Sequence, residues 1–428
     1  MAYLLNLVYL LLLAACSPWL IYSAIRKGKY REGFAAKFLG RTPIRQGDTP
    51  CIWLHAVSVG EVNVLGPLLT RLEKQQPEWT CVISTTTKTG FELARQKYSP
   101  RLVFYCPLDF SWAVKAALKR IRPDLLILAE LELWPNLIRM AKKHGVKLAV
   151  VNGRLSERSS RGYRRIYPLV ASILRAIDLI AVQNDEYGER FLRLGALPES
   201  VHTTGSIKFD GAQTNRENSK TRSLAKLAGI RPDDIIFLAG STQEPEEEMA
   251  LTAFQRLADE ISALKLIVTP RHPDRFGQVA GLLERADIAW QRRSELDQGA
   301  ATSDTRVLLV DAVGELGAWW GVSHIAYVGG SMGGKRGGQN MIEPAGYGAA
   351  VSFGPNTDNF RDVVTMMQQR DAAVVVADAN ELVEFVRRCA TDRPYAEQLG
   401  ERARSLVADQ QGAADRTCEM LQALMKLR

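Results

Sequence analysis

Short apolar runs recur along this chain, and each is followed by a stretch with helical, amphipathic character. In the first half of the chain the runs span residues 51–59, 80–86, 124–130, 146–152 and 178–184. In the second half they span residues 234–240, 264–270, 305–311, 323–330 and 349–354. Such runs are typical of strands buried on both faces of a parallel sheet, with helices as the crossover connections. The pattern predicts an α/β protein.

A polar stretch over residues 211–233 separates the two sets of runs. It is rich in Asn, Ser, Lys and Arg, and we interpret it as an interdomain linker. A length of 428 residues also exceeds what one ordinary hydrophobic core accommodates. We therefore predict two Rossmann-like domains that face each other across a cleft, spanning residues 26–212 and 213–428. Ligands of such domains bind beyond the carboxyl ends of the strands.

The composition limits the partners and the metal chemistry. A formal net charge of +8 suits an anionic membrane, a phosphorylated substrate or a nucleic acid, and does not choose among them. The six cysteines are scattered without CxxC spacing, which argues against a zinc site and against a disulfide framework. We predict no metal and no cofactor.

The first 25 residues carry no charged side chain, and the stretch from Tyr3 to Tyr22 is almost wholly apolar. Such a run is long enough to cross a hydrocarbon core of about 30 Å as a helix. Basic residues follow at once, against Glu32 alone: Arg26, Lys27, Lys29, Arg31, Lys37, Arg41 and Arg45. Because clustered Lys and Arg stay on the cytoplasmic side, we predict residues 1–25 as a single-pass transmembrane anchor and the rest as cytoplasmic.

This segment has two other interpretations, a lipoprotein signal and a helix that does not span the membrane. Residues 13–16 resemble a lipoprotein processing box that ends at Cys16. However, no basic residue precedes the apolar run, and the run continues through Ile21, whereas a secretory signal has the opposite charge order. Pro18 and Trp19 leave open a hairpin or an interfacial helix instead of a full span.

Three motifs in the first half carry candidate chemistry. Glu61 follows Gly60 at a strand-to-helix turn, where it either favours the helix dipole or serves as a general base. Glu130 and Glu132 follow an apolar strand, and their spacing sends both to one face of an extended chain. One of the two can form a structural salt bridge while the other serves the site. Lys208, at the end of the first domain, is either a solvated charge or a contact for an anion.

Two strand-to-helix loops in the second half could meet an anion. Gly240, Ser241 and Thr242 expose backbone N–H groups there, although an ordinary helix cap is the simpler interpretation. Arg271 and His272 lie between two prolines, in a stiff loop suited to a phosphate or a base edge. Arg271 could instead cap backbone carbonyls.

The strongest signal is a loop with six glycines among residues 329–338. Because glycine is costly in chain entropy, such a loop indicates that backbone approaches something closely, and Gly330 and Ser331 are candidate phosphate contacts. The loop matches neither a Walker motif nor a dinucleotide fingerprint. Residues 340–343 are predicted as a first helical turn that can hold a phosphate and a ribose hydroxyl.

In this order, the motifs resemble those of the Kdo transferase family, a group of GT-B inverting glycosyltransferases. The resemblance covers nearly the whole chain and rests on HAVSVGE, ELWPNLI, NGRLSERS, QNDEYGERFLRLG, TGSIKFD, PRHPDRF and the GGS…GG–N…E block. It implies transfer of the acidic sugar Kdo from CMP-Kdo to the lipid A precursor lipid IVA. The first domain would then bind the acceptor and the second the CMP-sugar.

The resemblance also implies residue roles. Glu61 matches the family's proton acceptor, and Glu130 and Lys208 match residues that stabilise the transition state, which leaves Glu132 as mainly structural. The residues that match CMP-binding segments are Arg271, His272, Val313, Gly314, Glu315, Asn340, Met341, Ile342 and Glu343. For the acceptor, we expect contacts from a basic stretch that is otherwise a solvated face, namely Arg158, Arg161, Arg164 and Arg165.

The expected partners are CMP-Kdo, lipid IVA and inner-membrane lipids, with no nucleic acid, and the expected location is the bacterial inner membrane. Two segments depart from the family pattern: Gln339 stands where similar enzymes often have His, and residues 243–245 replace a His-Glu-Gly segment. Another nucleotide-sugar glycosyltransferase, or an epimerase of the same fold, is the alternative enzyme. A non-catalytic, membrane-tethered nucleotide-binding protein is the other alternative, against which the presence of Glu61 argues. The number of Kdo units transferred does not follow from these motifs.

Overall fold

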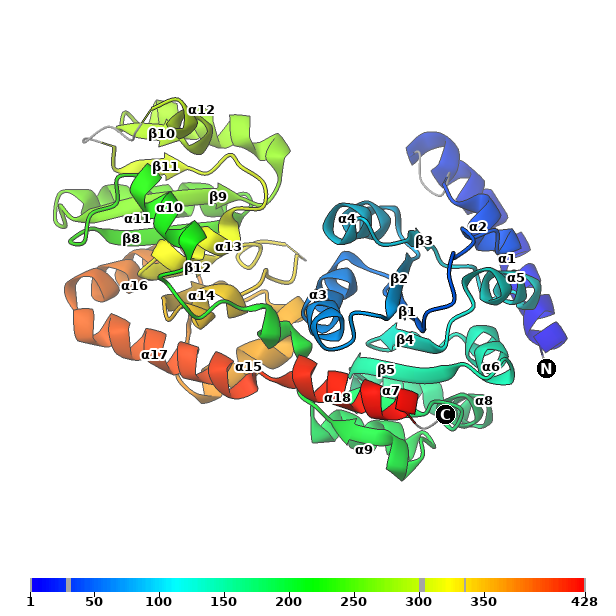
Figure 1. Ribbon diagram of the computed structural model, residues 1–428. Helices are drawn as coiled ribbons and strands as arrows, with labels where there is room; N and C mark the ends of the chain where they lie inside the picture. The colour runs from blue at the N-terminus through cyan, green and yellow to red at the C-terminus, as the bar shows by residue number, and fades with distance from the viewer. Residues whose placement is uncertain (1, 28–31, 300–304, 335, 427–428) are drawn as a thin grey trace. The chain divides into compact units, whose positions relative to one another are not determined.

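The chain forms two compact units in the computed structural model, which describes residues 2–27, 32–299, 305–334 and 336–426 (Figure 1). The first unit contains Met1–Gly211 together with Gln411–Arg428, and the second contains Ala212–Gln410. Two basic residues that the sequence analysis used, Lys29 and Arg31, lie outside the described residues, as does Lys335 of the glycine-rich loop. Each unit holds one parallel sheet between helices, which confirms the prediction of two Rossmann-like α/β domains.

The first unit is built on a seven-stranded sheet with the order β3-β2-β1-β4-β5-β6-β7, in which every neighbouring pair is parallel. Its strands are β1 (Cys51–His55), β2 (Thr80–Thr85), β3 (Val103–Tyr105), β4 (Leu125–Ala129), β5 (Lys147–Gly153), β6 (Leu179–Val182) and β7 (Val201–Thr203). Its helices are α1 (Ala2–Lys27), α2 (Phe34–Leu39), α3 (Val59–Gln75), α4 (Lys88–Tyr98), α5 (Ser111–Ile121), α6 (Pro135–Lys143), α7 (Glu157–Arg164), α8 (Tyr167–Leu174), α9 (Asp185–Arg193), α18 (Ala413–Lys426) and the 3₁₀ turns η1 (Pro198–Ser200) and η2 (Ile207–Gly211).

The central strands of this sheet are buried on both faces. Every residue of β1 and of β4 is buried, as their continuous apolar runs require. The helices that follow the strands begin at residues whose side chains cap the helix, such as Ser58 before α3 and Asn184 before α9. The carboxyl ends of β1 and β4 therefore lie side by side, and the polar residues that follow them share one edge of the sheet.

The last helix, α18, belongs to the first unit. Its apolar face, which includes Ala414, Cys418 and Leu421, lies in the core that α3 lines with Leu65 and Leu68. The sequence analysis assigned the C-terminal helices to the second domain, and the structure differs because this helix buries its apolar face against α3. The chain therefore returns to its first unit after completing the second.

The second unit repeats the architecture with the strand order β10-β11-β9-β8-β12-β13-β14, again parallel throughout. Its strands are β8 (Ile235–Thr242), β9 (Leu264–Pro270), β10 (Trp290–Arg292), β11 (Val307–Leu309), β12 (Ile325–Val328), β13 (Ala350–Phe353) and β14 (Val374–Val375). Its helices are α10 (Ser219–Leu227), α11 (Glu246–Ala258), α12 (Phe276–Arg285), α13 (Leu316–Trp319), α14 (Ile342–Gly346), α15 (Arg361–Gln369), α16 (Ala379–Thr391), α17 (Arg393–Gln410) and the 3₁₀ turns η3 (Pro273–Arg275), η4 (Arg293–Asp297), η5 (Trp320–Val322) and η6 (Asp358–Phe360).

The polar stretch over residues 211–233 is folded. Asn218 caps α10 by accepting a hydrogen bond from the Thr221 N–H (2.9 Å). The Thr221 hydroxyl donates to the carbonyl of Ala318 on α13 (3.2 Å). The interpretation of this whole stretch as a linker was therefore wrong, because its hydrophilic composition reflects a solvated helix of the second unit.

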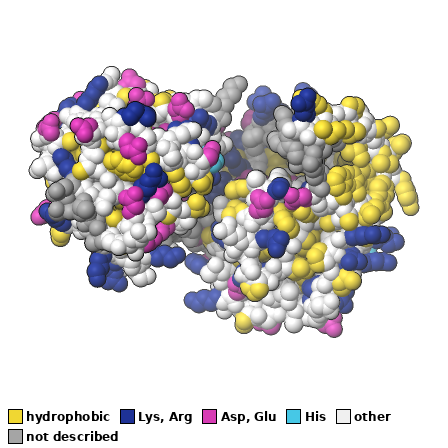
Figure 2. Space-filling view, turned by 90° about the horizontal axis from the view of Figure 1, so that it is seen from above, with side chains coloured by type: hydrophobic (Ala, Val, Ile, Leu, Met, Phe, Trp, Pro, Cys, Tyr) yellow, Lys and Arg dark blue, Asp and Glu magenta, His cyan; other side chains and the backbone are white. Residues whose placement is uncertain are grey.

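Helix α1 is docked on the first unit beside α5. The Asn6 amide donates to the Ser111 hydroxyl (2.7 Å), and the Tyr9 hydroxyl donates to the Asp109 carboxylate (2.9 Å). Most of the other apolar side chains of α1 are exposed, among them Tyr3, Leu4, Leu7, Leu11, Trp19 and Ile21. Figure 2 shows hydrophobic side chains gathered on this side of the unit. Among the described residues, no helix has the length and apolar character needed to cross a membrane.

Candidate functional site

Glu61 lies in the first turn of α3, directly after β1. Its carboxylate accepts hydrogen bonds from the Val57 N–H (2.8 Å) and from the Ser58 hydroxyl (2.7 Å). The Ser58 oxygen in turn accepts from the Glu61 N–H (3.3 Å). This reciprocal arrangement is similar to a capping box, with the Val57 N–H in place of the N–H of the cap residue Ser58, and it holds the carboxylate at the carboxyl edge of the sheet.

The surroundings of Glu61 also change its acidity. Burial raises the pKa of this carboxyl, and the negative charge of Glu130 raises it further. The hydrogen bonds from Val57 and Ser58 act in the opposite direction. A carboxylate with a raised pKa accepts a proton more readily. The same side chain can therefore cap the helix and act as a base.

Glu130 and Lys208 form an ion pair beside this position. The Lys208 ammonium lies 3.4 Å from a Glu130 oxygen, and each side chain is 24% exposed. Glu130 follows β4 in the left-handed backbone region, with φ of 54°. Because this turn interrupts the extended chain, the prediction that Glu130 and Glu132 share one face of a strand was wrong.

Glu132 has a different partner from Glu130. One of its oxygens accepts a hydrogen bond from the indole N–H of Trp134 (2.7 Å). Burial raises the pKa of Glu132 to about 7, and the charges of Glu61 and Glu130 contribute to the rise. Three interacting carboxyl groups and one lysine thus gather within the first unit, where the carboxyl ends of β1 and β4 meet.

Two residues that the sequence analysis passed over hold the Lys208 segment in place. Asn152, at the end of β5, is fully buried, and its side-chain oxygen accepts from the Ile207 N–H (3.0 Å). The Asp210 carboxylate accepts from the N–H groups of Gly412 (2.6 Å) and Ala414 (2.8 Å), at the start of α18. Both residues lie in segments on which the family resemblance rests. The sequence signal that could have identified them is a polar residue at the end of a strand (Asn152) and at the end of a domain (Asp210).

His55 lies beneath the carboxylates as a neutral side chain. It is fully buried, and burial lowers its pKa to about 4. Its Nδ1 atom lies 2.9 Å from the Ser84 hydroxyl, and its ring meets the Trp134 ring edge-on at 6.1 Å between centroids. His55 therefore supports Trp134 and carries no charge at neutral pH.

In the second unit, the glycine-rich loop is organised around one buried carboxylate, that of Glu246. This side chain is fully buried at the start of α11. Its two oxygens accept hydrogen bonds from the N–H groups of Gln243 (2.9 Å), Gly330 (2.7 Å), Ser331 (2.9 Å) and Met332 (2.9 Å), and from the Tyr327 hydroxyl (3.1 Å). The amides of Gly330 and Ser331, which we expected to meet the donor phosphate, thus already bind this carboxylate. The anion that this loop wraps is a side chain of the protein itself.

In the loop that ends β8, packing and backbone conformation account for the residue types at positions 240–242. A Cβ atom on Gly240 would lie 2.4 Å from the Trp320 ring, so glycine is needed there for packing. Ser241 adopts a φ of 54°, and Thr242 is fully buried with a hydroxyl that has no partner among the described residues. The Thr242 side chain is thus closed off from a ligand, and the phosphate contact expected of this loop concerns its backbone N–H groups.

Arg271 and His272 are exposed after β9. The Arg271 guanidinium donates to the Gln339 side-chain oxygen (3.0 Å). A Cβ atom on Gly330 would lie 3.1 Å from Gln339 and 3.4 Å from the Gln243 amide nitrogen. The two departures from the family pattern, Gln243 and Gln339, therefore meet at one place, beside Arg271.

The segment of Val313 to Glu315 is only partly open. Val313 is 77% exposed, whereas both Glu315 oxygens accept from Arg293, at 2.9 Å each. Glu315 also accepts from the Trp319 indole N–H (3.2 Å). Its carboxylate thus anchors the loop, and the exposed part of the segment is Val313 with Gly314.

Residues 340–343 precede and begin the short helix α14. The Asn340 amide donates to a Glu343 oxygen (2.9 Å), and the Ile342 N–H donates to the Asn340 oxygen (3.1 Å). Met341 and Ile342 have buried side chains, so only their backbone can face a ligand. A Cβ atom on Gly317 would lie 3.8 Å from the Glu343 carboxylate, which places Glu343 next to α13.

The four arginines expected to bind the acceptor are exposed on and just after α7: Arg158, Arg161, Arg164 and Arg165. Arg161 lies 3.5 Å from Glu157, which is one helical turn earlier. Among the residues that the structure describes, no group of three or more His, Cys, Asp or Glu side chains is arranged to hold a metal ion.

Comparison with solved structures defines the class of fold. The UDP-GlcNAc 2-epimerase from Neisseria meningitidis, solved with bound UDP-GlcNAc, aligns with a TM-score of 0.58 at 11% identity, over 87% of this chain and all (100%) of that chain. At this identity the likeness concerns the fold alone, which is GT-B-like.

Comparison of sequences identifies the family. Residues 29–211 match the family model described as 3-deoxy-D-manno-octulosonic-acid transferase (kdotransferase). The 3-deoxy-D-manno-octulosonic acid transferase of Haemophilus influenzae is 31% identical over 98% of each chain. A protein of the same name from Bordetella pertussis is 32% identical over 97% of this chain and 98% of its own length. The chain belongs to the Kdo transferase family and is a glycosyltransferase.

Proposed function

We propose that this protein transfers Kdo from CMP-Kdo to a lipid A precursor, with Glu61 as the catalytic base. The observation that carries the proposal is the half-buried Glu61 carboxylate beside the Glu130–Lys208 ion pair. The names of the relatives that match the whole chain support the donor sugar. Lipid IVA is the acceptor that we propose.

The chemistry follows from the properties of these groups. A sugar hydroxyl is a poor nucleophile until a base removes its proton, and Glu61 takes that proton. The hydroxyl oxygen then bonds to the anomeric carbon of Kdo as the bond from that carbon to the CMP phosphate breaks. Direct displacement from the opposite face inverts the anomeric centre. Lys208 and Glu130 are proposed to stabilise the charges that develop in the transition state.

We place the CMP site in the second unit. Arg271 and His272 are exposed cations or potential donors at the carboxyl end of β9, where parallel sheets bind their ligands. Val313 and Gly314, the backbone of residues 340–342, and Glu343 complete the proposed site. Arg271→Ala and Glu343→Ala should each weaken CMP binding at least about tenfold, a change of ~1.4 kcal/mol. Unchanged CMP affinity in both variants, measured by calorimetry, would remove this assignment.

We propose that α1 attaches the protein to the inner membrane. The exposed apolar side chains of α1 support this role. The sequence predicted a single-pass anchor with cytoplasmic catalytic units, whereas the docking of α1 on the first unit through Asn6 and Tyr9 favours an interfacial helix. Protease access to a tag before residue 1 in sealed spheroplasts separates the two: a spanning helix exposes the tag outside the cell, and an interfacial helix does not.

The reaction itself is tested by incubating the purified full-length protein with CMP-Kdo and lipid IVA and weighing the lipid product. We expect a mass increase of one or more Kdo residues together with the release of one CMP per residue. A nucleotide sugar whose configuration changes at constant mass, as seen by NMR, with no lipid product, would instead indicate an epimerase. Binding of CMP with no product of either kind would indicate a non-catalytic nucleotide-binding protein.

A further inference from the structure

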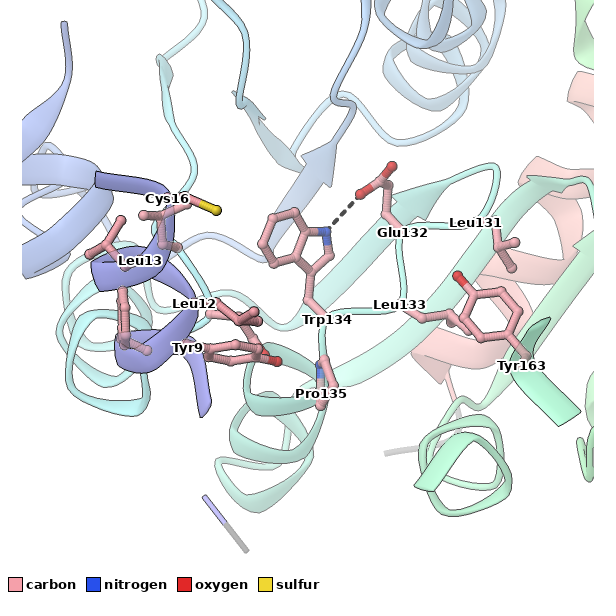
Figure 3. Close-up of a pocket in the computed structure, with 13 residues that line it drawn as sticks. Tyr9, Leu12, Leu13, Cys16, Leu131, Glu132, Leu133, Trp134, Pro135 and Tyr163 are labelled. Atoms are coloured by element: carbon pink, nitrogen blue, oxygen red, sulfur yellow. Dashed lines mark hydrogen bonds between the residues drawn. The ribbon is translucent and has the colours of Figure 1, made fainter. Parts of the chain in front are cut away.

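A pocket of about 610 Å³ opens in the first unit between α1 and the loop that follows β4 (Figure 3). Leu12, Leu13 and Cys16 approach it from α1, and Leu131, Leu133 and Trp134 approach it from the loop. All six are residues of this one unit. The lining is therefore mainly apolar, and it includes a helix whose outer face is also apolar.

The two carboxylates in the wall of this pocket already accept hydrogen bonds from the protein. The Asp109 carboxylate accepts from the Tyr9 hydroxyl (2.9 Å) and from the N–H groups of Asn136 (2.9 Å) and Leu137 (2.8 Å). Glu132 accepts from Trp134 within the wall (2.7 Å). A ligand in this pocket would thus meet mainly hydrocarbon surface, which suits a hydrocarbon chain.

Helix α7, which contributes one residue to the pocket wall, carries three exposed arginines and one acidic residue, Glu157. Tyr163 of α7 lines the wall, and the exposed arginines Arg158, Arg161 and Arg164 lie on the same helix. Arginine binds phosphate with two parallel hydrogen bonds. An apolar pocket, together with exposed arginines on a helix that contributes to its wall, matches an amphiphile that has a phosphorylated head and an acyl tail.

The position of the pocket relates it to the carboxylate cluster. Glu132 lines the pocket and lies only two residues after Glu130, which pairs with Lys208. A tail held in the pocket would therefore keep a lipid's sugar head near the residues at the sheet edge.

We propose that this pocket binds one acyl chain of the phosphorylated lipid acceptor, while the arginines of α7 contact a phosphate of the same lipid. The identity of the lipid rests on the proposed function, whereas the binding of an acyl chain does not. Helix α1 then serves as one wall of the acceptor site in addition to attaching the protein to the membrane.

Cys16 allows a direct test, because it is the exposed cysteine in the pocket and the other five cysteines are buried. A bulky maleimide on Cys16 would fill the pocket. The matched control carries the same adduct on the outer face of α1, through Leu11→Cys in a Cys16→Ser background; Leu11 is 62% exposed and does not line the pocket.

The binding measurement uses lysophosphatidic acid with a brominated stearoyl chain, kept below its micellar concentration. Bromine quenches indole fluorescence at contact, so the probe should quench Trp134, and Trp134→Phe should remove that quenching in a Trp19→Phe background. We expect the Cys16 adduct to abolish the quenching and the control adduct to preserve it. Quenching that persists with the Cys16 adduct, or that is lost equally with both adducts, would overturn the proposal.

The kinetic measurement uses lipid IVA and CMP-Kdo. The Cys16 adduct should raise the acceptor KM at least about tenfold and leave the KM for CMP-Kdo unchanged, and the control adduct should change neither. Equal acceptor KM values for the two adducts would overturn the proposal. If unmodified protein transfers no Kdo, the proposed function is wrong, and the quenching measurement alone decides whether the pocket binds an acyl chain.

Discussion

A carboxylate that caps a helix and a carboxylate that accepts a substrate proton can occupy the same position. The start of a helix that follows a parallel strand supplies N–H groups that hold the carboxylate, and it lies at the sheet edge where ligands bind. Glu61 lies at such a position: its oxygens accept hydrogen bonds from Val57 and Ser58, while burial raises its pKa. The two interpretations that the sequence left open, helix cap and general base, are therefore compatible with one position of this side chain.

Glu132 should make the stability of the first unit depend on pH. Its pKa is raised from 4.5 to about 7, so the folded protein binds this proton more tightly than the unfolded chain. Below 4.5 the group is protonated in both states, and stability is lost as the pH rises through about 7. Glu132→Gln should therefore raise the melting temperature by a few degrees at pH 8 and have little effect near pH 4.5. A scan by circular dichroism at both pH values measures this, and equal melting temperatures at pH 8 would contradict it.

Glu246 should control the glycine-rich loop. Glu246→Gln replaces an acceptor with an amide that donates, and each buried N–H left without an acceptor costs about 1–3 kcal/mol. We expect lower resistance to urea and a KM for CMP-Kdo that rises about tenfold or more, because the loop loses its fixed position. Glu248→Gln, in the same first turn of α11 but exposed, is the matched control and should change neither quantity.

At the scale of elements, the sequence predicted the inner strands of both sheets and missed their edges. The apolar runs did not predict four strands, β3, β7, β10 and β14, and each of these is an edge strand. Edge strands are short and partly exposed, as in β7 and β10, where no residue is fully buried. A continuous apolar run arises only where both faces of a strand are covered, so this signal is absent at the edges.

The candidate residues were recognisable from the sequence, but the contacts between them were not. Motif order and family resemblance pointed to Glu61, Glu130 and Lys208. Glu130 and Asn152 adopt left-handed backbone conformations, and the apolar runs that predict the strands before them give no sign of this. The hydrogen bonds from the Gly330 and Ser331 amides to Glu246 could not be predicted from the sequence either. They join residues that are separated by 84 and 85 positions along the chain.

Helix α7 offers a test of the acceptor side. Reversing two of its charges, Arg161→Glu with Arg164→Glu, should raise the acceptor KM about tenfold and reduce the dependence of that KM on salt, because fewer cations then meet the lipid phosphates. The KM for CMP-Kdo should stay unchanged. Kinetics with lipid IVA at low and high ionic strength measure both effects. An unaltered acceptor KM and salt dependence would leave these arginines as a solvated basic face.

At the scale of the whole molecule, the return of the chain to the first unit bears on the candidate site. Asp210 binds the start of α18 and lies two residues after Lys208. Asp210→Asn removes one of its two acceptor oxygens and should cost about 1–3 kcal/mol. We expect a lower melting temperature for the first unit and a reduced kcat, because the Lys208 segment is no longer held.

The control for this change is Asp415→Asn, on the same helix. Asp415 pairs with Arg71 at 2.6 Å, and both side chains are at least 36% exposed. A surface ion pair of this kind contributes little, so kcat and melting temperature should be near those of the wild type. If Asp210→Asn behaves like Asp415→Asn in both measurements, α18 does not position Lys208.

The most direct test of the account is the kcat of Glu61→Gln for Kdo transfer from CMP-Kdo to lipid IVA. Glutamine keeps the size and the hydrogen-bonding reach of the side chain but cannot take the proton. We predict a loss of at least about two orders of magnitude, with CMP affinity and melting temperature near wild type. Glu73→Gln, farther along α3 in an ion pair with Arg101, is the matched control and should keep its activity. Near wild-type activity in Glu61→Gln, especially with activity lost in Glu130→Gln or Glu132→Gln, would contradict the assignment of the base.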